Sequence, residues 1–149
     1  MSKIARSFLF VPGDRSDRFA KAAASGAHTM IIDLEDAVGL HAKAEARAAT
    51  EEWLASGNLC CVRINSADTE WFVDDITMVS RYDIPVMLPK ADLESLQKTS
   101  KAIPNQTLIA LVETVRGYME LRPMVAITNL SRFAFGSIDF GVESGIDDT

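Results

Sequence analysis

Long apolar runs are missing from this sequence of 149 residues. No run approaches the roughly 20 residues that a membrane-spanning helix needs. The N-terminal segment reaches Pro12 and Gly13 too soon to supply the apolar core of a signal peptide. We therefore expect a cytoplasmic protein that does not act with a membrane.

Cysteine and histidine are scarce. Cys60 and Cys61 are neighbours in an apolar run, where successive side chains of a strand point to opposite faces and cannot readily pair with each other. We expect buried free thiols in a reducing compartment rather than a disulfide or a metal site. His28 and His41 lack the spacing of zinc ligands, which makes zinc a poor candidate.

Basic clusters are also absent. The chain has 15 Lys and Arg against 21 Asp and Glu, for a formal net charge of −6, and its basic residues are spread along the sequence. This pattern disfavours binding to nucleic acids and to anionic membranes. Since 48% of the residues are hydrophobic, the composition is that of a soluble globular protein with one core.

Six short apolar runs predict strands. They begin at Arg6, Thr29, Leu59, Ile84, Thr107 and Arg132 and read RSFLFVP, TMIIDLE, LCCVRIN, IPVMLPK, TLIALVE and RFAFGSI. Because apolar and polar residues do not alternate in them, they are typical of parallel strands covered on both faces.

Segments of helical character separate these runs, at residues 16–26, 42–57, 69–82, 92–103 and 114–128. The first two end in Ser-Gly, a helix stop, and Ser16 or Asp17 and Asp92 are candidate N-caps. Strand starts lie 23 to 30 residues apart, which predicts a β/α alternation with right-handed crossovers. This local pattern does not choose between a doubly wound sheet and a (β/α)₈ barrel.

Polar residues gather after the strands, at the C-terminal ends where α/β folds build their sites. They are Arg15, Asp33, Glu35, Asp36, Arg63, Asn65, Lys90, Glu113 and Asp139. Carboxylates from different strands, without nearby Cys or imidazole, favour a hard ion such as Mg²⁺ or Mn²⁺. An arginine beside such an ion suits a substrate carboxylate or a carbonyl oxygen that gains negative charge, as in enolate chemistry.

Each of these residues also has a structural explanation. Glu113 could cap the helix that follows it, Arg63 could be the partner of Asp33 or Glu35, and Asp139 could end a strand. The functional interpretation is favoured because all of them fall on the same edge of the predicted sheet.

The sequence resembles the beta subunit of citrate lyase and its relatives in the HpcH/HpaI aldolase superfamily. The shared motifs occur in the same order and span nearly the whole chain: RSFLFVPGDRSDRFAKAAASGA, IIDLEDAV followed by KAEAR, VRIN, LPKAD, LVETVRG and FAFGSIDFGVESGI. The resemblance implies a TIM barrel. Such a barrel takes about 250 residues, so residues 1–149 are expected to hold only its first six β/α units, as one partial lyase domain.

The resemblance also implies an activity. The family cleaves a C–C bond in a 3-hydroxyacyl thioester with the help of Mg²⁺, giving a 2-oxo acid or glyoxylate and an acyl thioester. Its substrates include citryl, citramalyl and malyl thioesters of coenzyme A or of an acyl carrier protein.

Matching motifs assign roles to individual residues. Glu113 and Asp139 match the metal ligands, and Arg63 matches the substrate-binding arginine, with Arg63 and Glu113 as the catalytic pair. Arg15 and Lys90 match positions that contact the substrate or its thioester.

The remaining acidic residues are expected around these groups. Glu35 and Asp36 are predicted to orient Arg63, Lys90 or metal-bound water, while Asp33 is expected to be a structural partner only.

Two other functions stay open. One is a metal-dependent aldolase that acts on free 2-oxo acids and aldehydes, and the other is a catalytically incomplete barrel that binds or scaffolds partners. Six strands of a closed eight-stranded sheet leave two open edges, which favours association. We expect a piece of a longer protein or a chain that completes itself by association, and the family implies homo-oligomers, possibly within a larger lyase complex.

Overall fold

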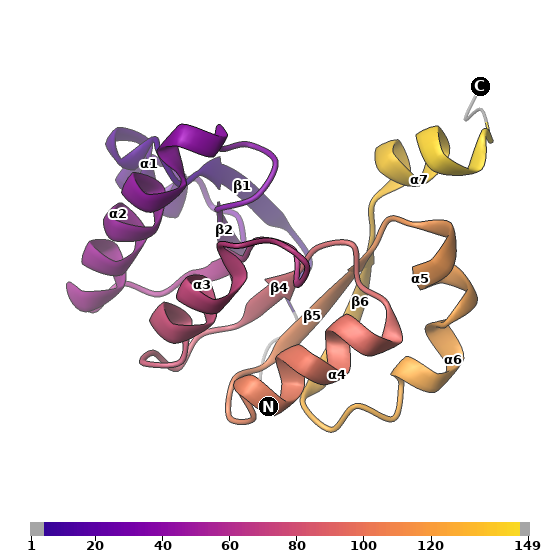
Figure 1. The fold of residues 1–149 in the computed structure, drawn as a ribbon. Coiled ribbons are helices and arrows are strands. Elements are labelled where there is room, and N and C mark those ends of the chain that lie inside the picture. Colours follow the sequence, from indigo (N-terminus) through magenta and orange to yellow (C-terminus); the bar gives the residue numbers. More distant parts are fainter. Residues whose placement is uncertain (1–4, 147–149) are drawn as a thin grey trace. The chain divides into compact units, whose positions relative to one another are not determined.

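The computed structural model describes residues 5–146 and contains the predicted β/α alternation (Figure 1). Its contacts divide the chain into two compact units, one ending at Arg63 and the other beginning at Ile64. Among the described residues, no helix has the length and apolar character needed to cross a membrane.

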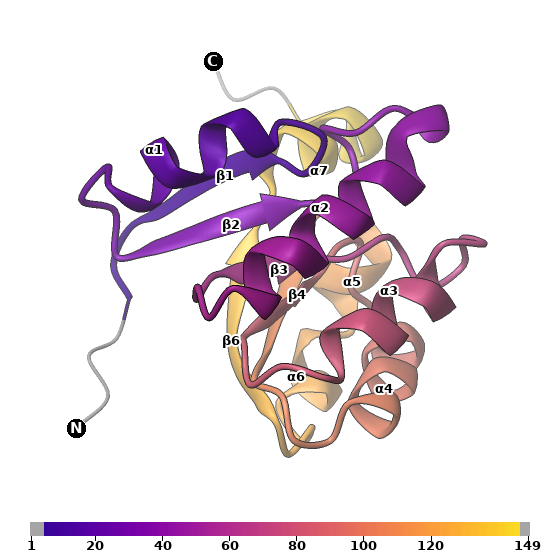
Figure 2. The ribbon, with the colours of Figure 1, turned by 90° about the vertical axis from the view of Figure 1, so that its left-hand side faces the viewer.

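Three parallel strands form the sheet of the first unit. They are β1 (Phe8–Pro12), β2 (Thr29–Asp33) and β3 (Cys61–Arg63), paired in chain order. Between them lie η1 (Ser16–Arg18), α1 (Phe19–Ala23), η2 (Leu40–Ala42) and α2 (Lys43–Ala55). Figure 2 shows β1 and β2 running side by side, with α1 along them. Ile31, Ile32 and Val62 are fully buried at the centre of this unit.

The strand register in the first unit decides which side chains meet. Asp33 is the register partner of Arg63 in β3 and of Pro12 in β1. The final residues of all three strands therefore lie next to one another at one edge of the sheet, as the parallel arrangement predicts.

The second unit also carries three parallel strands in chain order. They are β4 (Val86–Leu88), β5 (Leu108–Val112) and β6 (Leu130–Phe135). Its helices are α3 (Phe72–Val79), α4 (Leu93–Ala102), α5 (Val115–Met119), α6 (Leu121–Met124) and α7 (Ser137–Ser144). Leu88, Leu96, Leu108 and Met124 are among its fully buried side chains.

Local sequence signals account for several helix ends. The Asp92 side chain accepts a hydrogen bond from the Ser95 N–H, so Asp92 caps the start of α4, as predicted. The Ser95 hydroxyl accepts the Asp92 N–H in return, which completes a capping box. Gly26 and Gly57 follow α1 and α2 with φ of 87° and 81°, which confirms the Ser-Gly stops. Neither Ser16 nor Asp17 caps a helix, because the Asp17 carboxylate bonds the Arg15 guanidinium instead.

Three other predictions need correction. β1 and β6 are partly exposed rather than buried on both faces, because no segment of the described chain fully covers side chains such as Phe10 and Phe135. The helix expected over 114–128 is split at Glu120, because in a continuous helix the Pro123 ring would clash with the Met119 carbonyl. The last strand ends at Phe135, and Asp139 lies in the first turn of α7 rather than at a strand end.

Candidate metal and substrate site

Arg63 is held by a bidentate ion pair at the end of β3. Its Nε donates to Asp33 Oδ1 and its Nη2 to Asp33 Oδ2, both at 2.6 Å. The Asp33 side chain is 1% exposed and that of Arg63 is 11% exposed. Asp33, expected to be a structural partner only, thus makes the two shortest contacts of the arginine.

Two further carboxylates face the other end of the guanidinium. Arg63 Nη1 lies 3.3 Å from Glu35 Oε2 and 3.8 Å from Asp36 Oδ2. The Phe10 ring covers the guanidinium carbon at 5.1 Å. The predicted placement of Glu35 and Asp36 around Arg63 is therefore present within the first unit. Three carboxylates against one cation leave this cluster with an excess of negative charge.

The surroundings keep Arg63 charged. Burial alone would lower the pKa of its guanidinium, but the hydrogen bonds that it donates to Asp33 and the charges of Asp33, Glu35 and Asp36 outweigh burial and raise the pKa above its usual value. Arg63 is therefore a permanent hydrogen-bond donor and cannot act as a general base.

The turn after β1 packs against the end of β2. The Gly13 N–H donates to the Asp33 carbonyl at 2.8 Å, and a Cβ on Gly13 would lie 2.8 Å from Leu34 Cδ2. This close approach explains the glycine of the PGDR motif. Arg15, two residues later, turns its guanidinium to Asp17, with bonds of 2.9 and 2.8 Å. The hydrogen bond to Asp17 raises the pKa of Arg15.

In the second unit, Glu113 follows β5 as a buried carboxylate with 4% exposure. Its Oε1 accepts a hydrogen bond of 2.8 Å from the Lys90 N–H. Its Oε2 lies against Gly136, where a Cβ would be 2.8 Å from this oxygen and 2.7 Å from Glu113 Cβ. The capping role considered for Glu113 belongs to Thr114, whose hydroxyl accepts the Gly117 N–H at 3.0 Å.

Asp139 comes three residues after this glycine, in the first turn of α7, and is half-buried. Carboxylate oxygens are the ligands that Mg²⁺ prefers, and the ion usually keeps waters beside one or two of them. Within residues 5–146 no three or more His, Cys, Asp or Glu side chains group as a ligand set. Two carboxylates, Glu113 and Asp139, without a His or Cys ligand are donors that suit Mg²⁺ and do not suit zinc.

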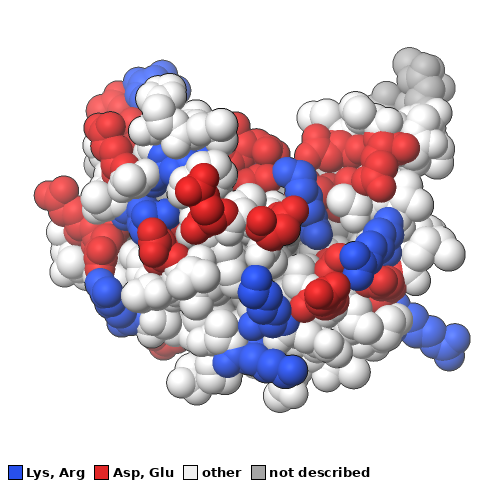
Figure 3. All heavy atoms as spheres, viewed as in Figure 1, with Lys and Arg blue, Asp and Glu red and all other residues white. Residues whose placement is uncertain are grey.

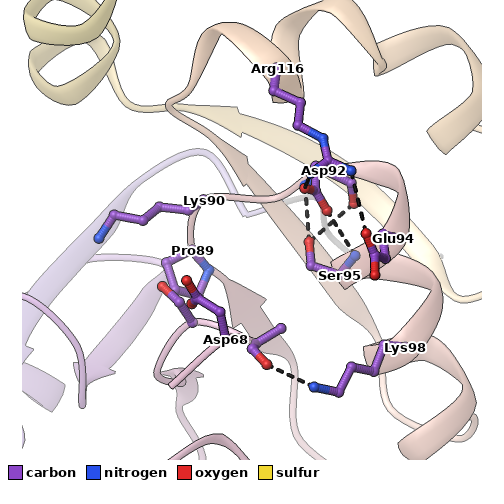
Figure 4. Close-up of a pocket in the computed structure, with 10 residues that line it drawn as sticks. Asp68, Pro89, Lys90, Asp92, Glu94, Ser95, Lys98 and Arg116 are labelled. Carbon is purple, nitrogen blue, oxygen red and sulfur yellow. Dashed lines mark hydrogen bonds and ion pairs between the residues drawn. The ribbon is translucent and has the colours of Figure 1, made fainter. Parts of the chain in front are cut away.

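Lys90 adopts an unusual backbone conformation in the turn after β4. Its φ is 48°, in the left-handed region that glycine favours. Among the described residues, Lys90 is the one non-glycine residue with a positive φ. This turn directs its N–H to Glu113, while its side chain is exposed. Figure 4 shows the ammonium end of Lys90 pointing away from Arg116.

A cavity of about 280 Å³ lies beside Lys90 in the second unit (Figure 4). Several of its charged side chains are engaged by other residues of the lining. Lys98 donates to the Ala67 carbonyl at 2.7 Å, and Arg116 lies 3.2 Å from Asp92 and 3.5 Å from Glu94. Glu113 and Asp139 are not part of its lining, so this cavity is separate from the metal ligands predicted from the sequence.

Asn65, another residue at a strand end, has a structural partner. Its N–H and its side-chain amide both donate to Asp75 Oδ2, at 2.8 and 2.7 Å, and Asp75 is fully buried. No local pattern links these two residues, because Asp75 lies on the following helix. On the surface drawn in Figure 3, Lys and Arg are interspersed with Asp and Glu and form no basic patch.

The chain is similar to known proteins over nearly its whole length. The family described as HpcH/HpaI aldolase/citrate lyase matches residues 6–149. A (3S)-malyl-CoA thioesterase of Cereibacter sphaeroides is 31% identical over 145 residues, which cover 93% of this chain and 50% of that protein. A citrate lyase subunit beta-like protein of Mycobacterium tuberculosis is 41% identical over 111 residues, covering 74% of this chain and 39% of that protein.

Solved structures share the fold. CitE from M. tuberculosis in complex with magnesium, acetoacetate and coenzyme A has a TM-score of 0.82 and 33% sequence identity, and the match covers 97% of this chain and 54% of that one. The likeness confirms the predicted fold, the first six β/α units of a TIM-barrel-like protein. The chain spans about half the length of the curated relatives it matches.

Proposed function

Because the chain belongs to the HpcH/HpaI aldolase/citrate lyase family, a family of enzymes, we propose that it acts as a Mg²⁺-dependent C–C lyase on 3-hydroxyacyl thioesters. Citryl-, citramalyl- and malyl-coenzyme A, or the same acyl groups on an acyl carrier protein, are the candidate substrates. The products are a 2-oxo acid or glyoxylate and an acyl thioester. The relative named for malyl-CoA and the CitE complex with magnesium and coenzyme A support this choice.

The observation that carries the proposal is the environment of Glu113. A carboxylate with 4% exposure is costly unless its charge is compensated. One oxygen accepts the Lys90 N–H, and the other packs against Gly136, where a Cβ would lie only 2.8 Å from it. This arrangement fits a metal ligand better than a surface acid.

Glu113 and Asp139 would hold the ion. When bound there, Mg²⁺ supplies a Lewis acid for the carboxylate and hydroxyl oxygens of the substrate. Glu113 would also contact the substrate.

Arg63 serves as the second source of positive charge. Asp33 accepts from its Nε–H and from one N–H of Nη2, which leaves the second N–H of Nη2 for a substrate oxygen. Since its pKa is raised, it stays protonated while negative charge grows on that oxygen during C–C cleavage. Glu35 and Asp36 orient it at the Nη1 side.

Arg15 and Lys90 are proposed contacts for the thioester carrier. Lys90 is exposed and Arg15 is partly exposed, and each follows a strand of its own unit. Cationic side chains of this kind suit phosphate groups such as those of coenzyme A.

The proposal also covers the setting of the enzyme. A cytoplasmic location agrees with Cys60 and Cys61, both buried as free thiols. A homo-oligomer, possibly part of a larger lyase complex, agrees with exposed apolar side chains that include Phe10, Phe135, Ile138 and Val142.

The test measures products from each coenzyme A thioester with and without MgCl₂. Release of 2-oxo acid or glyoxylate is followed by its reduction with a coupled dehydrogenase. We expect turnover that requires Mg²⁺ and is lost in Glu113→Gln and Asp139→Asn, whereas Glu143→Gln on the exposed side of α7 is the matched control. Mg²⁺ binding without turnover would favour the non-catalytic binding subunit, and variants with undiminished Mg²⁺ affinity would contradict the assignment of the ligands.

Thioester hydrolysis is a second candidate, favoured by the similarity to a malyl-CoA thioesterase over 93% of this chain. The two reactions give different products from malyl-CoA. Cleavage of the C–C bond yields glyoxylate and acetyl-CoA without a free thiol, whereas hydrolysis yields malate and free coenzyme A. A thiol reagent in the same assay therefore separates them.

A further inference from the structure

Lys43 is buried where a lysine is not expected. It is 5% exposed and shares one stripe of α2 with Ala46, Thr50 and Leu54. Lysine is almost never fully buried without partners. It is also the first residue of α2, where the positive end of the helix dipole disfavours a cation. Neither helix stability nor core packing explains a lysine at this position.

The Lys43 ammonium binds the loop that follows β2. Its Nζ donates to the carbonyl oxygens of Leu34 and Glu35, at 2.7 and 2.6 Å. Asp33 holds the same loop through its amides, because Oδ1 accepts the Glu35 N–H at 2.9 Å and Oδ2 accepts the Ala37 N–H at 3.0 Å. Carbonyls and amides of residues 34–37 are thus fixed by two different side chains.

The conformation of this loop decides how Arg63 is surrounded. Asp33 orients Nε and Nη2, but the Nη1 side faces Glu35 at 3.3 Å and Asp36 at 3.8 Å, and both belong to the loop. A change in the two carbonyls bound by Lys43 would rotate the backbone that carries these carboxylates.

We infer that Lys43 is a positioning residue for Arg63, acting through the loop carbonyls and the carboxylates of Glu35 and Asp36. Its effect on catalysis rests on the proposed function, whereas its effect on Arg63 does not. The ammonium suits this role because its three donors can bind two carbonyl oxygens from one point at the end of a long side chain.

Three variants test the inference. Lys43→Met keeps the length of the side chain and removes the charge, Lys43→Arg restores a cationic donor, and Lys21→Met removes an exposed lysine of α1 as the matched control. The first readout is the ¹H–¹⁵N resonance of the Arg63 Nε–H group. The second is hydrogen exchange at the Glu35 and Ala37 amides, with the Ile31 and Ile32 amides of β2 as internal references.

We expect Lys43→Met to shift the Arg63 resonance and to speed exchange at Glu35 and Ala37 by about tenfold or more, which corresponds to about 1.4 kcal/mol. The β2 references should not change, Lys43→Arg should recover most of both signals, and Lys21→Met should leave them as in the wild type. A folded Lys43→Met protein with unchanged signals would overturn the inference.

If Lys43→Met does not fold, hydrogen exchange of the lysine ammonium groups in the wild-type protein tests the inference instead. Slow solvent exchange of the Lys43 ammonium hydrogens supports the hydrogen bonds from Lys43 to the loop carbonyls. Exchange as fast as that of the Lys21 ammonium overturns the inference.

Turnover of malyl-CoA with MgCl₂ separates this inference from the proposed function. Misplacing Arg63 should lower kcat by about tenfold in Lys43→Met and change KM little, because the interaction strengthens as charge develops. If the wild type does not turn over, the proposed function fails, and the resonance and exchange data still decide the role of Lys43.

Discussion

Asp33 and Arg63 are the last residues of two neighbouring parallel strands, and their register brings them together in a bidentate pair with two bonds of 2.6 Å. The carboxylate of Asp33 also accepts the Glu35 and Ala37 amides, so one side chain orients both the arginine and the loop beside it. Arg63 is thereby fixed before any ligand binds, which lowers the cost of ordering it in a complex.

Removing Asp33 should destabilise the fold. Asp33→Ala leaves a guanidinium with 11% exposure beside the vacated space, and loss of one partner of a buried ion pair costs about 3–5 kcal/mol. Urea unfolding monitored by circular dichroism measures this change. Asp17→Ala breaks the exposed pair with Arg15 and should leave the unfolding midpoint unchanged. Equal midpoints for both variants would show that the Asp33 pair contributes no more than a surface contact.

Magnesium affinity should rank the acidic residues. Glu113→Gln replaces a proposed ligand and should weaken Mg²⁺ binding by more than about 100-fold, while Asp36→Asn changes a carboxylate predicted only to orient other groups and should cost about tenfold. Isothermal titration with MgCl₂ gives both affinities. The reverse order would move the metal site to the DLED segment.

A methyl group at position 136 should displace the Glu113 carboxylate. The new Cβ of Gly136→Ala would lie 2.8 Å from Glu113 Oε2, so the side chain must move and Mg²⁺ affinity should fall at least tenfold, by about 1.4 kcal/mol. Gly141→Ala, within the helix that Gly136 precedes, is the control, since its Cβ would meet its nearest neighbour at 3.3 Å. Calorimetry that finds equal affinities for the two variants would separate Glu113 from metal binding.

Stability should fall at alkaline pH because of Cys60. Burial raises the pKa of this thiol from its usual 9.0 to about 12. In the unfolded chain the thiol ionises from about pH 9, while in the folded protein it keeps its proton up to about pH 12. The contribution of Cys60 to the free energy of unfolding is therefore complete below pH 9 and is lost between pH 9 and about 12. Urea midpoints at pH 8 and pH 10 should differ more in the wild type than in Cys60→Ala. Parallel pH profiles would refute this assignment.

Association should depend on the apolar residues of α7. Ile138 and Val142 are 81% and 82% exposed, one helical turn apart. Sedimentation velocity should show an oligomer at micromolar concentration that dissociates in Val142→Glu. Leu40→Glu, at a residue 72% exposed in the first unit, is the control and should not change the sedimentation coefficient. A monomeric wild type would contradict the proposed oligomer.

Much of the fold was predictable because local patterns dominate it. The six apolar runs became the six strands of the described chain, and Asp92, Gly26 and Gly57 act as the cap and stops that their residue types indicate. The errors have tertiary causes. The exposure of β1 and β6 depends on which segments pack over side chains such as Phe10 and Phe135, and the residue after β6, Gly136, lies in close contact with Glu113.

The site was predictable only in outline. Placing Arg63, Glu35 and Asp36 at strand ends follows from the β/α pattern, and their proximity within the first unit agrees with it. The roles of Glu113, Asp139, Arg15 and Lys90 remain predictions from the family motifs. The partnership of Asp75 with Asn65 and that of Lys43 with the loop after β2 were not foreseen, because each joins residues eight or more positions apart.

The sequence by itself determined the alternation of strands and helices, the edge of the sheet that carries the polar residues, and the family. These properties follow from side-chain periodicity and from motifs read in order. Tertiary structure alone decided that Asp33 rather than Glu35 forms the bidentate pair with Arg63. It also decided that Gly136 leaves room for the Glu113 side chain and that the Lys90 N–H donates to Glu113. Strand register and close backbone approach set these contacts, and both depend on how distant segments pack rather than on the residues next to them in the chain.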